Sequence, residues 1–197
     1  MIAHLNYQID KEHYKKIFFD RYDTGGWHKE GDVVLDYWWK VFNIDDEVMP
    51  ITKDLGIEDL VTKPRFSYQF PNSTLPEHID QDRIIGINLN LMPDLPSITI
   101  DDKSFEYENC LVDVGSKIHC VKADKNPRLV LKYAIRSNWN EIYKRLDKRG
   151  LINHIKTTQS NPYYLKYNSE LTENDQKYVR NQGSIVKNDY KYNHIRR

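Results

Sequence analysis

Apolar positions in the first part of the chain recur with the period of an amphipathic helix. The clearest case is residues 10–22, where Asp10 suits the N-cap position. A second helix is expected after Asp32, and a short helical turn at residues 57–61. We therefore expect residues 1–64 to form a helical layer. The apolar face of its first helix consists of Tyr14, Ile17, Phe18 and Tyr22.

From Arg65 onward the pattern changes to short β-rich segments, separated by turn-forming residues about every ten positions. This spacing is typical of a β-sandwich or a β-barrel. We expect a mainly β fold with flanking helices, in which eight strands form a double-layered barrel and the helices cover its outer face. The predicted strands are residues 65–70, 77–82, 84–91, 97–101, 104–108, 110–114, 117–122 and 128–135.

Two of these segments alternate strictly between an apolar and a polar face, because successive side chains of a strand point to opposite sides. If helices cover the apolar face, the polar face must line an interior cavity, as a catalytic barrel requires. The apolar faces are Ile85, Ile87, Leu89 and Leu91 in one segment and Leu129, Leu131, Tyr133 and Ile135 in the other. The opposite faces include Gly86, Asn88 and Asn90, and Arg128 and Lys132.

A further helix is predicted after Ser137, with Gly150 as its stop. Beyond it, residues 151–197 carry eight Lys or Arg against four Asp or Glu, a net charge of +4. A capping box at 172–175 favours one more short helix there. We expect residues 65–136 to be the catalytic core of a single domain. Residues 137–197 would add a helix and a basic, Tyr/Asn-rich tail, which is either a lid over the barrel or a loose arm.

The composition narrows the functional classes. Lys plus Arg (29) equals Asp plus Glu (29), so no global basic field indicates nucleic-acid binding. The two cysteines, Cys110 and Cys120, cannot form a disulfide framework. No apolar run approaches membrane-spanning length, and the N-terminus lacks a basic and then apolar signal segment. We expect a cytoplasmic protein with no membrane partner.

Three residues are candidates for a metal site. His78 and Asp80 lie two positions apart in a predicted strand, which would point both side chains to one face. His119 lies in the middle of a later predicted strand. Two imidazoles and one carboxylate form the facial triad of non-haem Fe(II) oxygenases, which leaves coordination positions open. The other histidines, expected at the surface, are His4, His13, His28, His154 and His194.

The pattern His78-x-Asp80, His119 and Arg128 resembles the motif of the iron(II)/2-oxoglutarate-dependent dioxygenases. The resemblance covers about residues 65–136 and implies a double-stranded β-helix, which is a jelly-roll or cupin-like barrel. The turn after His78 is similar to the prolyl-hydroxylase-like branch. The stretch that begins at His119 is more similar to the aspartyl/asparaginyl-hydroxylase branch, which commonly lacks the metal-binding carboxylate.

The resemblance also implies residues that bind the co-substrate. Arg128, nine residues after His119, would pair with the far carboxylate of 2-oxoglutarate, because a guanidinium bonds a carboxylate bidentately. Tyr68 resembles a tyrosine whose hydroxyl binds the same co-substrate in some branches. Asn88 is a further candidate on the polar face of its strand. Lys132 and Arg136 are the rival anchors.

The implied cofactors are Fe(II), 2-oxoglutarate and dioxygen, with ascorbate as an additional candidate. The implied reaction is hydroxylation, with release of succinate and carbon dioxide. A protein side chain or an amino-acid-like substrate is favoured over nucleic acid. Two alternatives stay open at this stage: a cupin-like metal enzyme of another reaction type, and a non-catalytic barrel that binds peptide or nucleic acid through its basic tail.

Overall fold

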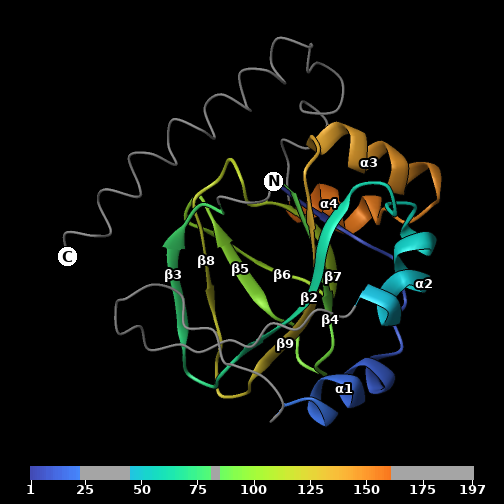
Figure 1. Cartoon of the computed structure of the whole chain (residues 1–197). Coiled ribbons are helices and arrows are strands. Elements are labelled where there is room, and N and C mark those ends of the chain that lie inside the picture. Colours follow the sequence, from blue (N-terminus) through green and yellow to red (C-terminus); the bar gives the residue numbers. More distant parts are fainter. Residues whose placement is uncertain (23–44, 81–84, 161–197) are drawn as a thin grey trace.

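The computed structural model describes residues 1–22, 45–80 and 85–160, which form nine strands and four helices. The strands make two antiparallel sheets that face each other (Figure 1). The larger sheet has the order β1-β7-β4-β9-β2 and the smaller one β3-β8-β5-β6. The strands are β1 Ile2–His4, β2 Val61–Gln69, β3 Thr74–His78, β4 Ile85–Asn90, β5 Ser97–Ile100, β6 Lys103–Glu106, β7 Asn109–Asp113, β8 His119–Lys122 and β9 Arg128–Ile135.

The helices lie on the outer face of the larger sheet (Figure 1). They are α1 Lys11–Asp20, α2 Asp45–Leu55, α3 Trp139–Lys148 and α4 His154–Ser160. The main hydrophobic core lies between the helices and this sheet. It includes Phe18 of α1, Leu55 of α2 and Leu146 of α3. None of the helices within the described ranges is both long and apolar enough to cross a membrane. The predicted class, a mainly β double-layered barrel with flanking helices, is confirmed.

The two faces of β4 and β9 divide as the sequence predicts. Leu129, Leu131, Tyr133 and Ile135 of β9 belong to the helix-facing core, as do Ile85, Ile87 and Leu89 of β4. The alternate residues of β4 and β9 face the smaller sheet. Among them, Asn88 of β4 and Lys132 of β9 are direct cross-strand partners within the larger sheet. A second, smaller apolar cluster fills part of the space between the sheets, with Ile98 of β5 and Val112 of β7 among its members. The polar faces therefore point into the barrel.

The helical turn predicted at residues 57–61 is a hydrogen-bonded turn and not a helix, since the N–H of Leu60 donates to the carbonyl of Ile57. The helix lies upstream, as α2, and β2 already begins at Val61. Gly56, with φ +65°, ends α2: its N–H donates to the carbonyl of Lys53 and that of Ile57 to the carbonyl of Thr52, a Schellman motif. The sequence misleads here because Pro50 suggests a break, yet the helix continues through it.

Several predicted strands shift or were missed. The strand expected at 77–82 is instead β3, Thr74–His78, and the one expected at 65–70 begins four positions earlier. The three-residue strand β1 was not predicted, because three residues show no usable alternation. His4 lies within it and is buried, which corrects the expected surface position. In contrast, β9 has the predicted bounds, and α3 begins after the N-cap Asn138 close to the predicted start.

Some expectations lie outside the described residues. These are the helix expected after Asp32, the capping box at 172–175 and the tail from residue 161 onward, including its choice between lid and loose arm.

Replacing Phe18 should test how α1 is attached to the barrel. Phe18 is fully buried and packs edge-on against Phe66 and stacked on Tyr68, both from β2. Phe18→Ala should lower the free energy of unfolding by about 3–5 kcal/mol, measured by denaturant titration. Phe19→Ala is the control, since Phe19 is 49% exposed and should cost at most about 1 kcal/mol. Equal effects of the two changes would contradict the packing described here.

Candidate metal centre

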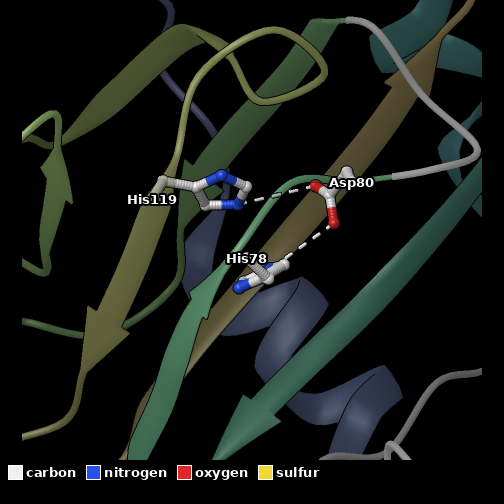
Figure 2. A group of neighbouring side chains, drawn as sticks. All are labelled: His78, Asp80 and His119. Carbon is white, nitrogen blue, oxygen red and sulfur yellow. Dashed lines mark ion pairs between the residues drawn. The ribbon is translucent and has the colours of Figure 1, made fainter. Parts of the chain in front are cut away.

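His78, Asp80 and His119 lie together at one end of the smaller sheet. His78 is the last residue of β3, His119 is the first of β8, and the two are direct cross-strand partners. Asp80 follows two residues after His78, outside the strand. The expectations that His78 and Asp80 share a strand face and that His119 lies in mid-strand are therefore wrong, although the three side chains do meet. Figure 2 shows the carboxylate of Asp80 beside the two imidazole rings, with an ion-pair contact to each of them.

Local backbone structure explains why β3 ends where the site begins. Pro76 cannot donate a backbone hydrogen bond, and the β3–β8 register shifts between Leu75 and His78. The chain then leaves the strand, with Ile79 buried. The backbone N–H of Asp80 donates to the carbonyl of Val114, at 2.9 Å, in the loop after β7. This bond ties the segment across to the larger sheet and holds the carboxylate near both imidazoles.

The three donor groups have the separations of a metal site. Nε2 of His78 is 3.5 Å from one carboxylate oxygen of Asp80, and Nε2 of His119 is 3.7 Å from the other. Bonds of about 2.1 Å to one ion can join donors up to about 4.2 Å apart. One donor atom from each residue lies within 4.8 Å of the others, and the two rings are 4.2 Å apart between centroids. A small contraction around one cation would complete the coordination.

Both imidazoles are oriented by the same kind of hydrogen bond to a backbone carbonyl. Nδ1 of His78 lies 2.7 Å from the carbonyl oxygen of Pro76, and Nδ1 of His119 lies 3.1 Å from that of Lys117. A carbonyl only accepts, so Nδ1 carries the proton and donates. In the neutral ring Nε2 then keeps its lone pair, and this is the nitrogen that faces Asp80. Such outer hydrogen bonds are the usual way in which proteins fix a metal-binding tautomer.

His119 is held in the neutral form that a metal ligand requires. Its side chain is only 3% exposed. Burial, reinforced by the neighbouring ring of His78, lowers the pKa of His119 to about 3, despite the opposing effect of Asp80. Its Nε2 lone pair is therefore available throughout the neutral pH range. A carboxylate facing two such lone pairs is an arrangement that a cation would stabilise.

A narrow cavity connects the triad with the polar interior of the barrel. Asp80 and His119 line it together with Asn88, Arg128 and Lys132. Arg128 is 95% buried, and one of its guanidinium nitrogens donates to the hydroxyl of Tyr107 at 2.5 Å. Its Nε is buried without a hydrogen-bond partner in the part of the chain that the structure describes. The predicted residues Arg128 and Asn88 thus share one cavity with Asp80 and His119.

Two other predicted residues lie elsewhere. Tyr68 pairs with Leu129 on the opposite face of the larger sheet from Arg128, and packs on Phe18 and Phe70 in the helix-facing core. The predicted contact of Tyr68 with a co-substrate is therefore wrong, because its side chain lies on the face of the sheet that is away from the cavity. Arg136, a rival anchor, is exposed. Tyr107 is the aromatic residue that does reach Arg128. The sequence reasoning placed it in the strand predicted at 104–108 and missed its role, because nothing in that segment indicates a partner 21 positions away; in the structure it follows the end of β6.

The comparisons with known proteins agree on the fold. No protein-family model matches the chain, and no curated protein matches it in sequence. A prolyl-4-hydroxylase of Pseudomonas putida superposes with a TM-score of 0.50 at 14% identity, over 70% of this chain and 92% of that one. A prolyl hydroxylase from Trichoplax adhaerens, in complex with a peptide fragment of hypoxia inducible factor, gives 0.52 at 12%, over 68% and 82%. The fold is a double-stranded β-helix.

Removing either histidine should abolish metal binding. We expect about one Fe(II) per chain after anaerobic reconstitution, and near-complete loss of iron in His78→Ala and in His119→Ala, because two remaining ligands hold the ion poorly. His13→Ala is the matched control, since His13 lies on the exposed side of α1. Metal analysis after gel filtration measures the result. Full iron occupancy in the double variant of His78 and His119 would exclude this triad.

Proposed function

We propose that the chain is a non-haem Fe(II)- and 2-oxoglutarate-dependent dioxygenase, which hydroxylates a protein side chain or an amino-acid-like substrate. One observation carries the proposal: two members of the triad, Asp80 and His119, line a cavity that is also lined by the buried cation Arg128. Many metal proteins have such ligands, but an oxygenase of this kind also needs an anchor for an acidic co-substrate.

The donor set fits Fe(II). Two neutral imidazoles and one carboxylate are the ligands typical of non-haem iron oxygenases, and they leave coordination positions for other ligands. His78 and Asp80 come from the end of β3 and the loop after it, and His119 from β8. All three therefore approach from the smaller sheet, while the larger sheet contributes none of the ligands. When bound, the iron would supply activation of dioxygen, and oxidative loss of carbon dioxide from 2-oxoglutarate would leave succinate.

The protein's part is to bind and orient the co-substrate. Arg128 would hold the far carboxylate of 2-oxoglutarate, because its guanidinium stays charged and has an unsatisfied buried donor at Nε. Tyr107 helps to fix the guanidinium, because its hydroxyl accepts a hydrogen bond from one of the terminal nitrogens. Burial raises the pKa of the Tyr107 hydroxyl, so that it stays protonated and can donate. Asn88, 4% exposed, adds an amide to the same interior face.

Entry of the co-substrate requires side chains to move. The cavity has a volume of about 10 Å³, enough for about one water molecule. The groups that fill the rest of this space include the long side chains of Arg128 and Lys132, which can adopt other rotamers more easily than the strands can separate. We therefore expect these side chains to rearrange when 2-oxoglutarate binds.

The activity itself is tested by incubating the iron-loaded protein with 2-oxoglutarate and dioxygen. Slow formation of succinate without substrate would support the co-substrate assignment, and candidate peptides and amino acids can then be screened for faster succinate formation coupled to a product heavier by one oxygen atom. The variant His119→Ala should form no succinate. Succinate formation at the same rate in that variant would mean that the reaction does not use this site.

Arg128→Ala should weaken 2-oxoglutarate binding by about 2–5 kcal/mol, because it removes a charge-assisted pair in a buried site. Anaerobic titration of the visible absorption of the Fe(II) complex with 2-oxoglutarate measures the affinity. Arg136→Ala is the control, as Arg136 is an exposed arginine directly after the other end of the same strand. Unchanged affinity in Arg128→Ala would exclude Arg128 as the anchor and leave Lys132 as the remaining cation of the cavity.

A further inference from the structure

The loop between β7 and β8, residues 114–118, holds two of the three triad side chains through its backbone. The carbonyl of Val114 accepts the backbone N–H of Asp80 at 2.9 Å. The carbonyl of Lys117 accepts a hydrogen bond from Nδ1 of His119 at 3.1 Å. The two carbonyls lie three positions apart in one short loop. A shift of this loop would therefore displace both side chains relative to the third member of the triad.

A buried carboxylate fixes this loop. Asp113, the last residue of β7, is 2% exposed. Its Oδ1 accepts the backbone N–H of Ser116 at 3.1 Å, and its Oδ2 accepts the hydroxyl of Ser116 at 2.5 Å. The N–H of Asp113 donates to the carbonyl of Met1 at 3.0 Å, so the backbone that carries this carboxylate is itself held. Because Ser116 lies between Val114 and Lys117, its two bonds restrain both carbonyls that hold the triad.

Asp113 lies away from the triad itself. It is the cross-strand partner of Ile85, and such partners project to the same side of a sheet. Ile85 belongs to the helix-facing core, so Asp113 lies on the side of the larger sheet that is away from the cavity. Burying a carboxylate is costly unless hydrogen bonds compensate it. The two bonds from Ser116 supply this compensation, so the burial of Asp113 favours the arrangement that holds the loop.

A second carboxylate reaches the same loop from outside. Asp101 lies in the turn between β5 and β6, with Oδ2 at 2.9 Å from Nζ of Lys117, and its backbone N–H donates to the carbonyl of Ile118. The side chain of Asp101 is 52% exposed and that of Lys117 is 34% exposed. Ion pairs at such positions contribute little, because water screens the charges and the side chains lose freedom. The buried contact of Asp113 with Ser116 is therefore the stronger restraint.

We propose that Asp113 is a positioning residue of the metal centre. Through Ser116 it fixes the loop whose carbonyls hold two of the ligands, Asp80 and His119. This inference rests on the proposed function, since it requires a metal at the triad. A metal site needs its ligands within about 0.5 Å of the productive geometry. A loop that is free to move by more than this would hold the metal poorly, although the fold could stay intact.

The test compares Asp113→Ala with Asp113→Asn. Alanine removes both bonds to Ser116, whereas the asparagine amide can accept the N–H of Ser116 and donate to its hydroxyl oxygen. Co²⁺, a redox-stable substitute for Fe(II), should bind about tenfold more weakly to Asp113→Ala and within about twofold of wild type to Asp113→Asn. Calorimetric titration measures the affinity. The visible absorption of bound Co²⁺ reports the coordination geometry, and it should change in Asp113→Ala alone of these two variants.

Two further variants complete the test. Ser116→Ala removes only the hydroxyl bond, and it should weaken Co²⁺ binding by about threefold. Asp101→Asn is the matched control, because it removes the exposed carboxylate at the same loop and keeps the backbone bond to Ile118. Asparagine also tolerates the φ of +47° at this position. Asp101→Asn should leave the Co²⁺ affinity and the spectrum unchanged. The thermal unfolding midpoint of each metal-free variant is measured as well.

A merely structural role predicts a different pattern. Asp113→Ala would then lower the unfolding midpoint of the metal-free protein, while the folded protein kept the Co²⁺ affinity and the spectrum of wild type. That result overturns the inference. Weaker binding with an altered spectrum, restored in Asp113→Asn, supports it. If Asp113→Ala does not fold, Ser116→Ala decides, and unchanged affinity there overturns the inference.

The outcomes also separate this inference from the proposed function. If wild type and His119→Ala bind Co²⁺ equally, the triad holds no metal and both fail. If wild type binds Co²⁺ through the triad but forms no succinate when loaded with Fe(II), the proposed function fails, and the Asp113 variants still decide the inference. If wild type forms succinate and Asp113→Ala binds Co²⁺ as wild type does, only the inference fails.

Discussion

The structure depends on the burial of both faces of the larger sheet. A strand that is covered on one side only must be apolar on that side and polar toward water. Here the helices cover one face with an apolar core, which includes Phe18, Leu55 and Leu146. The smaller sheet covers the other face and forms only a modest apolar cluster. Because the helix side supplies most of the hydrophobic burial, the interior face can carry Asn88, Arg128 and Lys132 without loss of the fold.

The triad depends on a second constraint, the short antiparallel pairing of β3 with β8. His78 and His119 face each other across this pair. Each ring donates from Nδ1 to a backbone carbonyl two residues before it, so the orientation of the donors comes from the main chain and not from side chains that could rearrange. Asp80 is tied separately, through its N–H to Val114 of the other layer. The site therefore joins the two layers of the barrel.

The sequence predicted those parts of the molecule whose physical signal is local. The alternation in residues 128–135 predicts β9 correctly, because one face of this strand packs in the apolar core and the other faces the polar interior of the barrel. The motif also identified the three side chains that meet in the structure, although the strand containing His78 was placed too late because Pro76 interrupts the pairing. Tyr68 shows the limit of such reasoning. Alternation predicts that Phe66 and Tyr68 share one face of their strand, but only the positions of the helices show that this face is the outer one.

Other features are set by contacts far apart in the sequence. Tyr107 reaches Arg128 across 21 positions, and no property of its own segment distinguishes it from a loop tyrosine. The strand β1 is defined only by its pairing with β7, since three residues are too few to show a period. Likewise, the position of Lys132 opposite Arg65 becomes visible only when the register of β2 and β9 is known.

The alternation along β9 has a consequence for how this barrel can change in evolution. Residues that are adjacent in the sequence belong to different parts of the structure. Leu131 and Tyr133 belong to the helix-facing core, whereas Lys132 between them lines the cavity. Substitutions at interior positions alter the charge and shape offered to a ligand while the apolar layer stays intact. A mutant library restricted to the interior positions of β4 and β9 would therefore sample new ligand preferences with few unfolded members, although its targets are interleaved with core residues in the gene.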